Sequence, residues 1–404
     1  MALVAALLAY GPTAQPYLDA VQSGLGAALV SLTASSTRAG QPGWPLAEVS
    51  PRGCACLLEG LRAAAAPEGE GPKLMAGDTA LTWLMAVLGE RHVGLLTHWP
   101  QVHGGGRPGI AATVTPAVDL LQLPLSPVGG GGGGEGGEAL AAPPGYQEAL
   151  NRDGAVRALV LVLEALDGEA LALPVNLLSR LVLVSTSFAS QFIAAGGLAP
   201  ALVQRLLRDS QPPALLIDVL LVVSQLARVS KEGFNTYEAI SRANCYAQVK
   251  RLLSHTDPGV RARVCNLLGN MCRHSAYFYT ALERHGLVGP LIERCADTDR
   301  STRKFACFAI GNAGFHNHSL YEALRPAIAP LVALLRGPEE DDKTRANAAG
   351  ALGNLVRNSG ALCGELVRAG ALRALLDTAL APERPASAAR GSLASTGGAG
   401  AGGG

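Results

Sequence analysis

Aromatic residues are scarce in this sequence, and neither sign of charge dominates it. Phe, Trp and Tyr make up 4% of the 404 residues, whereas hydrophobic residues make up 49% and glycine occurs 49 times. We therefore expect an interior of small and aliphatic side chains at close backbone approach, which favours packed helices. The net charge of +1 excludes a global field that would attract nucleic acid or an anionic membrane. The sequence accordingly predicts no nucleic-acid partner and no membrane partner.

Long apolar runs and closely spaced cysteines are also missing. No apolar run approaches the ~20 residues that a membrane-spanning helix needs. The eight cysteines lack the spacing of a disulfide framework or a zinc knuckle, which indicates a reducing compartment inside the cell. Cys265 and Cys307 occupy the same position of a repeat, as small buried hydrophobic residues would.

Enzyme motifs are absent as well. The sequence contains no Walker loop, no H-E-x-x-H helix, no nucleophile elbow and none of the HRD and DFG elements of protein kinases. Residues 104–109 match G-x-G-x-x-G, but no strand leads into them and Arg-Pro interrupts the expected helix start, so we predict a loop. His316 and His318 lack a third metal ligand nearby and are interpreted as exposed turn residues. We predict no catalytic, metal-binding or cofactor-binding residue in this chain.

What the sequence does contain is a Gly-Asn pair that recurs with a period of 42 residues, at 269–270, 311–312 and 353–354. Nine residues before each Asn stands an arginine, namely Arg261, Arg303 and Arg345. Acidic loops precede these segments and are typical of helix starts. Because a glycine inside a helix costs ~1 kcal/mol relative to alanine, three glycines in register predict close packing against a neighbouring repeat.

A second repeated feature is a glycine followed five residues later by a large aliphatic residue. It occurs at Gly154, Gly197, Gly286 and Gly370, and copies without the glycine lie at 244–253 and 326–335. Each repeat is therefore predicted to contain a short helix, a glycine turn, a second helix, a polar loop and a third, longer helix.

The segments LLGNMCR, AIGNAGF and ALGNLVR resemble the third helices of the armadillo family. The expected fold class is an all-α, armadillo/HEAT-like right-handed superhelical solenoid. Four regions are predicted: irregular helical repeats at 1–123, a Gly/Pro-rich flexible linker or loop at 124–145, armadillo repeats at 146–381 and a disordered tail at 382–404.

Third helices are expected to line a concave groove, in which Asn270, Asn312 and Asn354 form a ladder that can donate to and accept from a peptide backbone. The candidate peptide groove comprises Asn266, Asn270, Arg273, His274, Phe308, Asn312, Phe315, His316, Asn347, Asn354, Arg357 and Asn358. The structural alternative is that the asparagines bridge helix ends within the solenoid. The arginine series is interpreted as ion pairing between repeats.

The stretch from Arg273 to Ser359, which includes RKFACFAIGNAGFHNHSLYEAL, resembles the C-terminal armadillo region of the Fused family of serine/threonine kinases. The resemblance implies a regulatory, non-catalytic scaffold in hedgehog signalling and motile-cilium or microtubule assembly. It implies kinesin-like and Suppressor-of-Fused-type protein partners, and a cytoplasmic location associated with the cytoskeleton or the cilium.

Kinases of this family carry the catalytic domain at the N-terminus, so the resemblance implies that this chain is a C-terminal fragment, an isoform or a partial gene product. ATP and Mg are then expected only if the parent kinase domain is present. The alternative is a stand-alone armadillo adaptor unrelated to a kinase.

Overall fold

The chain forms two compact units, residues 1–249 and 250–404, in a computed structural model. The structure describes residues 51–64, 75–127, 140–141, 143–230 and 236–380. Residues 1–50 and 65–74 of the predicted irregular repeats, residues 128–139 of the predicted linker and the tail predicted at 382–404 lie outside these described residues.

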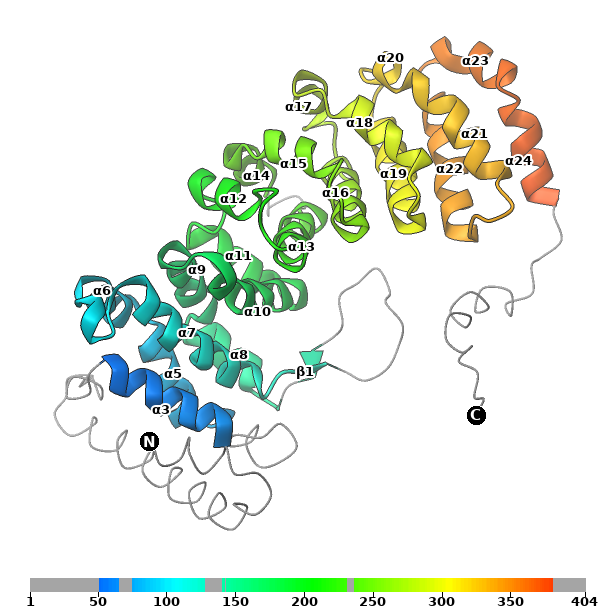
Figure 1. Cartoon of the computed structure of the whole chain (residues 1–404). Helices are drawn as coiled ribbons and strands as arrows, with labels where there is room; N and C mark the ends of the chain where they lie inside the picture. Colours follow the sequence, from blue (N-terminus) through cyan, green and yellow to red (C-terminus); the bar gives the residue numbers. More distant parts are fainter. Residues whose placement is uncertain (1–50, 65–74, 128–139, 142, 231–235, 381–404) are drawn as a thin grey trace, which may run out of the picture. The chain divides into compact units, whose positions relative to one another are not determined.

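Helices make up most of the described residues of the first unit (Figure 1). They are α3 (Pro51–Ala64), α5 (Asp78–Leu88), α6 (Glu90–His98), η2 (Gln101–His103), α7 (Gly106–Gln122), α8 (Tyr146–Arg152), α9 (Ala155–Ala165), η3 (Gly168–Leu171), α10 (Ala172–Val184), α11 (Thr186–Ala194), α12 (Pro200–Leu206), α13 (Pro213–Val229) and α14 (Tyr237–Ala243). The helix α15 (Tyr246–Leu252) crosses from the first unit into the second. Leucine, valine and alanine dominate the buried side chains, as the scarcity of aromatic residues predicts.

Two short strands pair with each other within the predicted linker, one near each of its ends. Strand β1 (Ser126–Pro127) pairs antiparallel with β2 (Leu140–Ala141). The Tyr146 hydroxyl donates to the Leu121 carbonyl at 3.0 Å, and Arg180 of α10 donates to the Leu125 carbonyl at 2.6 Å. The structure thus packs residues from both sides of the predicted linker within the first unit.

The motif at 104–109 differs from its predicted form. It is not a loop throughout, because α7 begins at Gly106 and includes Pro108. Proline is tolerated there because the amide groups of the first helical turn have no partner inside the helix.

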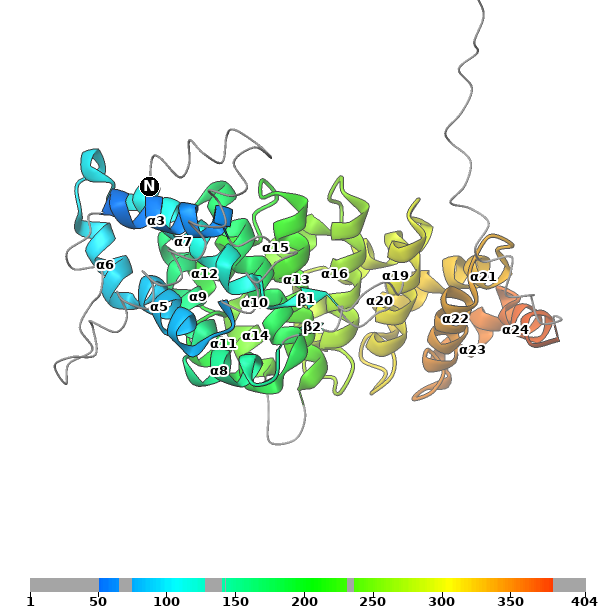
Figure 2. The same cartoon turned by 90° about the horizontal axis from the view of Figure 1, so that it is seen from below.

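The second unit repeats one arrangement of helices. It contains α16 (Pro258–Met271), α17 (Tyr279–Arg284), α18 (Val288–Glu293), η4 (Arg294–Ala296), α19 (Arg300–Ala313), α20 (Tyr321–Leu324), η5 (Arg325–Ala327), α21 (Ile328–Arg336), α22 (Asp342–Asn354), η6 (Gly360–Leu362), α23 (Cys363–Arg368) and α24 (Ala371–Leu380). The third helices α16, α19 and α22 lie side by side (Figures 1 and 2). Apart from β1 and β2 the described elements are helical, so the predicted all-α class is confirmed.

Each third helix begins at an acidic cap. The carboxylates of Asp257, Asp299 and Asp341 accept hydrogen bonds from the amides three residues later, at 3.0, 2.7 and 2.6 Å. Such caps satisfy amide groups that the helix itself leaves without partners. The capping role predicted for the polar loops is therefore confirmed.

The glycine turns are left-handed, with one correction. Gly154, Gly286 and Gly370 have φ of 75°, 62° and 73°, values that glycine adopts without strain. In the turn that contains Gly196 and Gly197, the left-handed residue is Gly196 and not the predicted Gly197. Asn244, which stands where one copy lacks the glycine, adopts φ of 47°, as asparagine tolerates better than other residues do.

Close packing explains the helical glycines only in part. A Cβ added at Gly269 would lie 2.4 Å from the Phe308 ring, and one at Gly311 would lie 3.4 Å from the Ala351 Cα. Nothing lies within 4 Å of such an atom at Gly353, so the prediction is wrong for this third glycine. Among the described residues, α22 is the last third helix, and no later one packs over Gly353.

Candidate protein-binding surface

The candidate residues lie on the second unit, on α16, α19, α22 and the segments that follow these helices. Two inter-repeat hydrogen bonds organise the asparagine ladder. Asn312 donates through Nδ2 to the Gly269 carbonyl, and Asn354 donates to the Gly311 carbonyl, both at 2.9 Å. Asn270 is 4% exposed, and its Nδ2 donates to Asn266 at 3.2 Å. These contacts correspond to the structural alternative for the asparagines.

Three other side chains make the same kind of link between successive repeats. Asn347 donates to the Lys304 carbonyl at 3.2 Å, and Asn358 donates to the Phe315 carbonyl at 2.9 Å. His316 places Nε2 at 3.3 Å from the Arg273 carbonyl. Each partner precedes its side chain by 43 residues. We call this set of contacts, together with those of Asn312 and Asn354, the inter-repeat staples.

The candidate residues differ in exposure. Arg273, His274, Phe315, Arg357 and Asn358 are exposed. Asn266, Phe308, Asn312, His316, Asn347 and Asn354 are half-buried. A ligand can therefore reach the segments after the third helices more readily than it can reach the asparagine ladder.

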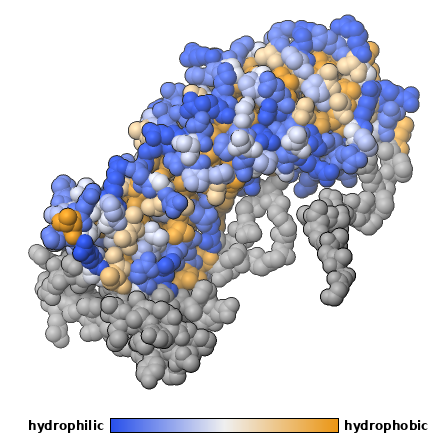
Figure 3. Space-filling model, in the orientation of Figure 1, coloured by the Kyte–Doolittle hydropathy of each residue, from blue (hydrophilic) through white to orange (hydrophobic). Residues whose placement is uncertain are grey.

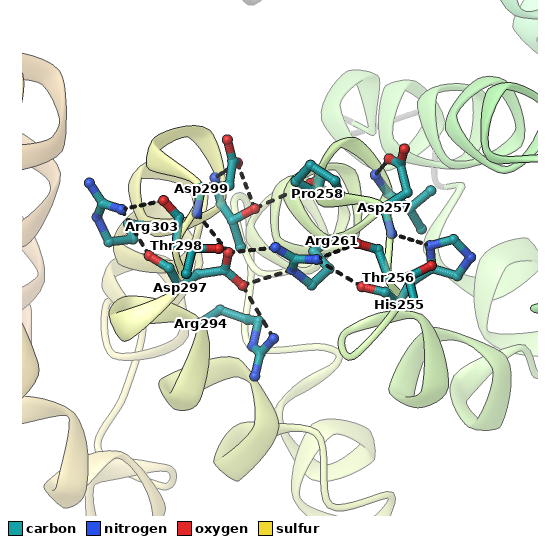
Figure 4. Close-up of polar contacts among 12 residues, drawn as sticks. His255, Thr256, Asp257, Pro258, Arg261, Arg294, Asp297, Thr298, Asp299 and Arg303 are labelled. Atoms are coloured by element: carbon teal, nitrogen blue, oxygen red, sulfur yellow. Dashed lines mark hydrogen bonds and ion pairs between the residues drawn. The ribbon is translucent and has the colours of Figure 1, made fainter.

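The arginine series forms the predicted ion pairs at two of its three positions, and Figure 4 shows the pair of Arg261 with Asp297. Arg261 donates two hydrogen bonds to the Asp297 carboxylate, at 2.8 and 2.7 Å, and Arg303 donates to Glu340 at 2.7 Å. Arg345 instead donates to the Gly337 carbonyl at 2.6 Å. The carboxylates of Asp297 and Glu340 are buried, so these pairs contribute to the structure of the solenoid and not to its outer surface.

A pair of tyrosines completes the inter-repeat geometry, and the sequence reasoning missed it. The Tyr279 hydroxyl donates to the Asn312 carbonyl at 2.5 Å and accepts from the His316 amide at 3.2 Å. Tyr321 does the same with the Asn354 carbonyl at 2.6 Å and the Asn358 amide at 3.0 Å. The two tyrosines stand one 42-residue period apart, and this spacing could have revealed them.

We expect Tyr321→Phe to destabilise the second unit by about 1–2 kcal/mol, because the Asn354 carbonyl and the Asn358 amide each lose a partner while the ring stays packed. Urea unfolding of the full chain measures this loss. Ser301→Ala, which removes the hydroxyl of an exposed residue of α19, serves as the control and should change stability by no more than about 0.5 kcal/mol. Equal effects of the two substitutions would contradict the clamp role of Tyr321.

The described residues contain no group of three or more His, Cys, Asp or Glu side chains that could hold a metal ion. All eight cysteines are free thiols, and Cys265 and Cys307 are fully buried, as their shared repeat position predicts. None of the described helices combines the length and apolar character of a membrane span.

Figure 3 shows a face on which hydrophilic residues surround smaller hydrophobic patches.

Known proteins contain the same arrangement of repeated helices. The armadillo/beta-catenin-like repeat family matches residues 324–357. A designed armadillo repeat protein superposes with a TM-score of 0.51 at 21% identity, over 56% of this chain and 93% of that one. An engineered protein of the Northeast Structural Genomics Consortium reaches a TM-score of 0.57 at 18% identity, over 88% and 95% of the two chains. This chain is an armadillo-type solenoid.

A further armadillo protein, designed and solved in complex with the peptide (KR)4, superposes with a TM-score of 0.50 at 19% identity, over 65% of this chain and 97% of that one. Armadillo repeats of this geometry thus occur in a protein that holds a peptide, although the likeness concerns the fold alone.

Two natural proteins resemble the sequence. Serine/threonine-protein kinase TIO of Arabidopsis thaliana is 36% identical over 222 residues, which are 48% of this chain and 16% of that protein. Serine/threonine-protein kinase 36 of Pongo abelii is 31% identical over 127 residues, which are 30% of this chain and 10% of that protein. The armadillo chain therefore matches only a small part of the length of either kinase.

Proposed function

We propose that this chain is a non-catalytic scaffold that binds an extended protein segment along its third helices. The observation that carries the proposal is a row of exposed side chains, Arg273, Phe315, Arg357 and Asn358. They lie on the segments that follow the third helices, which the inter-repeat staples hold in register. Because the staples fix the backbone of these segments, binding a ligand does not require the backbone to be ordered first. The peptide held by the designed armadillo protein supports the same use of this fold.

The likeness to TIO and to kinase 36 supports a second part of the proposal. The chain would act as the regulatory C-terminal part of a Fused-like serine/threonine kinase, in hedgehog signalling and in motile-cilium or microtubule assembly. Kinesin-like and Suppressor-of-Fused-type proteins would be its partners, in the cytoplasm and at the cytoskeleton or cilium. ATP and Mg would bind only to the kinase domain of such a parent protein.

A binding assay with purified partners tests the scaffold. We expect the full chain to bind a kinesin-like or a Suppressor-of-Fused-type protein, and Phe315→Ala combined with Arg357→Ala to weaken binding by at least about tenfold, since aromatic and arginine side chains carry most interface energy. Arg368→Ala, at an exposed arginine of α23, is the control.

Unchanged binding by the double variant, with its helical circular dichroism retained, would refute this surface as the binding site. Sequencing the transcript upstream of Met1 tests the kinase part separately, because a kinase parent requires VAIK, HRD and DFG elements.

A further inference from the structure

The segments that follow the three third helices form one continuous row of contacts. The Arg357 guanidinium lies over the Phe315 ring, 4.3 Å from its centroid. The Phe315 and His316 rings meet edge to face at 5.0 Å, and His316 reaches the Arg273 carbonyl. We name Arg273, Phe315, His316 and Arg357 the cationic edge. It crosses three successive repeats of the second unit.

Charge around the cationic edge has one sign. The segments 271–279, 313–321 and 355–363 contain no Asp and no Glu, whereas they contain Arg273, Arg357 and three histidines. At the opposite ends of the same helices, arginine charge is neutralised, because Arg261 pairs with Asp297 and Arg303 pairs with Glu340.

Both guanidinium groups of the cationic edge keep their hydrogen-bond donors available. Within the described part of the chain, the structure shows no carboxylate or carbonyl partner for the side chain of Arg273 or of Arg357. The Arg357 guanidinium lies over the Phe315 ring. A guanidinium stacked on an aromatic ring still directs its N–H groups outward in the plane that matches a carboxylate. The stacking also reduces the freedom that Arg357 would lose on binding.

The ordinary structural explanation for cations here is the helix dipole, which favours positive charge near a helix C-terminus. This explanation accounts for the sign of the charge. It does not account for the row of contacts across repeats, and the terminal carbonyls of Asn312 and Asn354 already accept from Tyr279 and Tyr321. Within the described residues, the guanidinium groups of Arg273 and Arg357 are therefore available to a ligand.

We propose that the cationic edge binds an acidic, extended protein segment, with carboxylates on Arg273 and Arg357 and an apolar side chain on Phe315. The inference rests on the proposed scaffold function and names the chemical class of its partner. Neighbouring helices pack about 10 Å apart, so an extended segment of about seven residues, at about 3.3 Å per residue, spans the two intervals from Arg273 to Arg357.

A nucleic acid is the less favoured ligand because the net charge is +1 and the edge offers two arginines. Tight binding to a phosphate backbone relies on the release of many counterions, and so requires more cations than this edge has.

Fluorescence anisotropy with the full chain tests the inference. The probes are labelled peptides of about ten residues in which glutamate, lysine or glutamine alternates with glycine around one leucine, and a DNA duplex of similar length. We expect the glutamate peptide to bind at least about tenfold more tightly than the other probes, and added salt to weaken it. Arg273→Glu combined with Arg357→Glu should abolish that binding and favour the lysine peptide.

Arg284→Glu combined with Arg368→Glu is a matched control. These exposed arginines end α17 and α23, stand as many residues apart as Arg273 and Arg357 do, and change the net charge equally. Binding of the glutamate peptide should survive in this control.

Four outcomes would overturn the inference: no peptide binding, tighter binding of the lysine or glutamine peptide, tighter binding of DNA, or equal loss in the two double variants. The scaffold function would still be judged by capture of the partner proteins. A chain that captures them but does not prefer the glutamate peptide refutes only the acidic class of ligand.

Discussion

Replacing Asp297 by Asn is expected to destabilise the unit formed by residues 250–404 by about 3 kcal/mol. The Asp297 side chain is 3% exposed and holds two arginines, Arg261 at 2.7 Å and Arg294 at 3.2 Å. It also accepts from the Asp299 amide at 2.9 Å. Removing one partner of a buried ion pair leaves the other charge without compensation, and such losses typically cost about 3–5 kcal/mol.

Equilibrium unfolding in urea, monitored by far-ultraviolet circular dichroism, measures the effect. Asp377→Asn provides the control, since Asp377 pairs with Arg373 at side chains that are 53% and 77% exposed. Exposed pairs contribute about 0–1 kcal/mol. A loss at Asp297 no larger than the loss at Asp377 would show that the buried network of Figure 4 does not hold the repeats together.

The same carboxylate makes stability depend on pH. Burial by itself raises the pKa of Asp297. Hydrogen bonds from Arg261 and the Asp299 amide, together with the charges of Arg261 and Arg294, lower this pKa by more than burial raises it. The pKa of Asp297 therefore lies below its usual value. The folded unit therefore binds this proton less readily than the unfolded chain does. Its contribution to stability is complete above the unfolded value of about 3.9 and is lost as the pH falls through the folded value. Asp297→Asn should show a shallower decline of stability below about pH 4.

Replacing Gly269 by Val is expected to cost about 3 kcal/mol, through steric overlap between repeats. A Cβ at this position would lie 2.4 Å from two atoms of the Phe308 ring and 3.2 Å from the Ala309 Cα. The ring could rotate away, but the backbone of α19 cannot move without separating the two third helices, α16 and α19. The higher helix propensity of valine offsets only a few tenths of a kcal/mol.

Gly353→Val is the matched control, because Gly353 holds the same position of a later repeat and has nothing within 4 Å of an added Cβ. We expect its unfolding free energy to change by less than about 0.5 kcal/mol. Combining Gly269→Val with Phe308→Ala should recover part of the loss by removing the ring. If the two glycine substitutions proved equally mild, close packing would not be the reason for glycine at 269.

Local features of the fold could be predicted from the sequence. The acidic residues before α16, α19 and α22 predict helix caps, because a cap and its target amide stand three residues apart in the same chain segment. The Gly-Asn period predicts the third helices and their stacking, because a repeated apolar pattern requires a repeated neighbour. Pairing of Arg261 with an acidic loop follows from the same repetition.

The partners of the candidate residues could not be predicted in this way. An asparagine at 312 suits a peptide ligand and a neighbouring helix equally well, since an amide binds any backbone. The structure directs its Nδ2 to the Gly269 carbonyl. The 42-residue spacing of Tyr279 and Tyr321 marks them as repeated residues. It does not identify their hydroxyl partners, which stand 33 residues away in another helix.

The sequence by itself determined the repeat, the helices within it, their caps and the positions of the arginines and asparagines, because each of these depends on spacing along one segment. Only the tertiary structure decided which of these polar groups are used within the solenoid and which face solvent. That decision depends on how one helix stacks on the next, which brings a side chain to a carbonyl 43 residues earlier. It also leaves Arg273 and Arg357 without a carboxylate in the part of the chain that the structure describes.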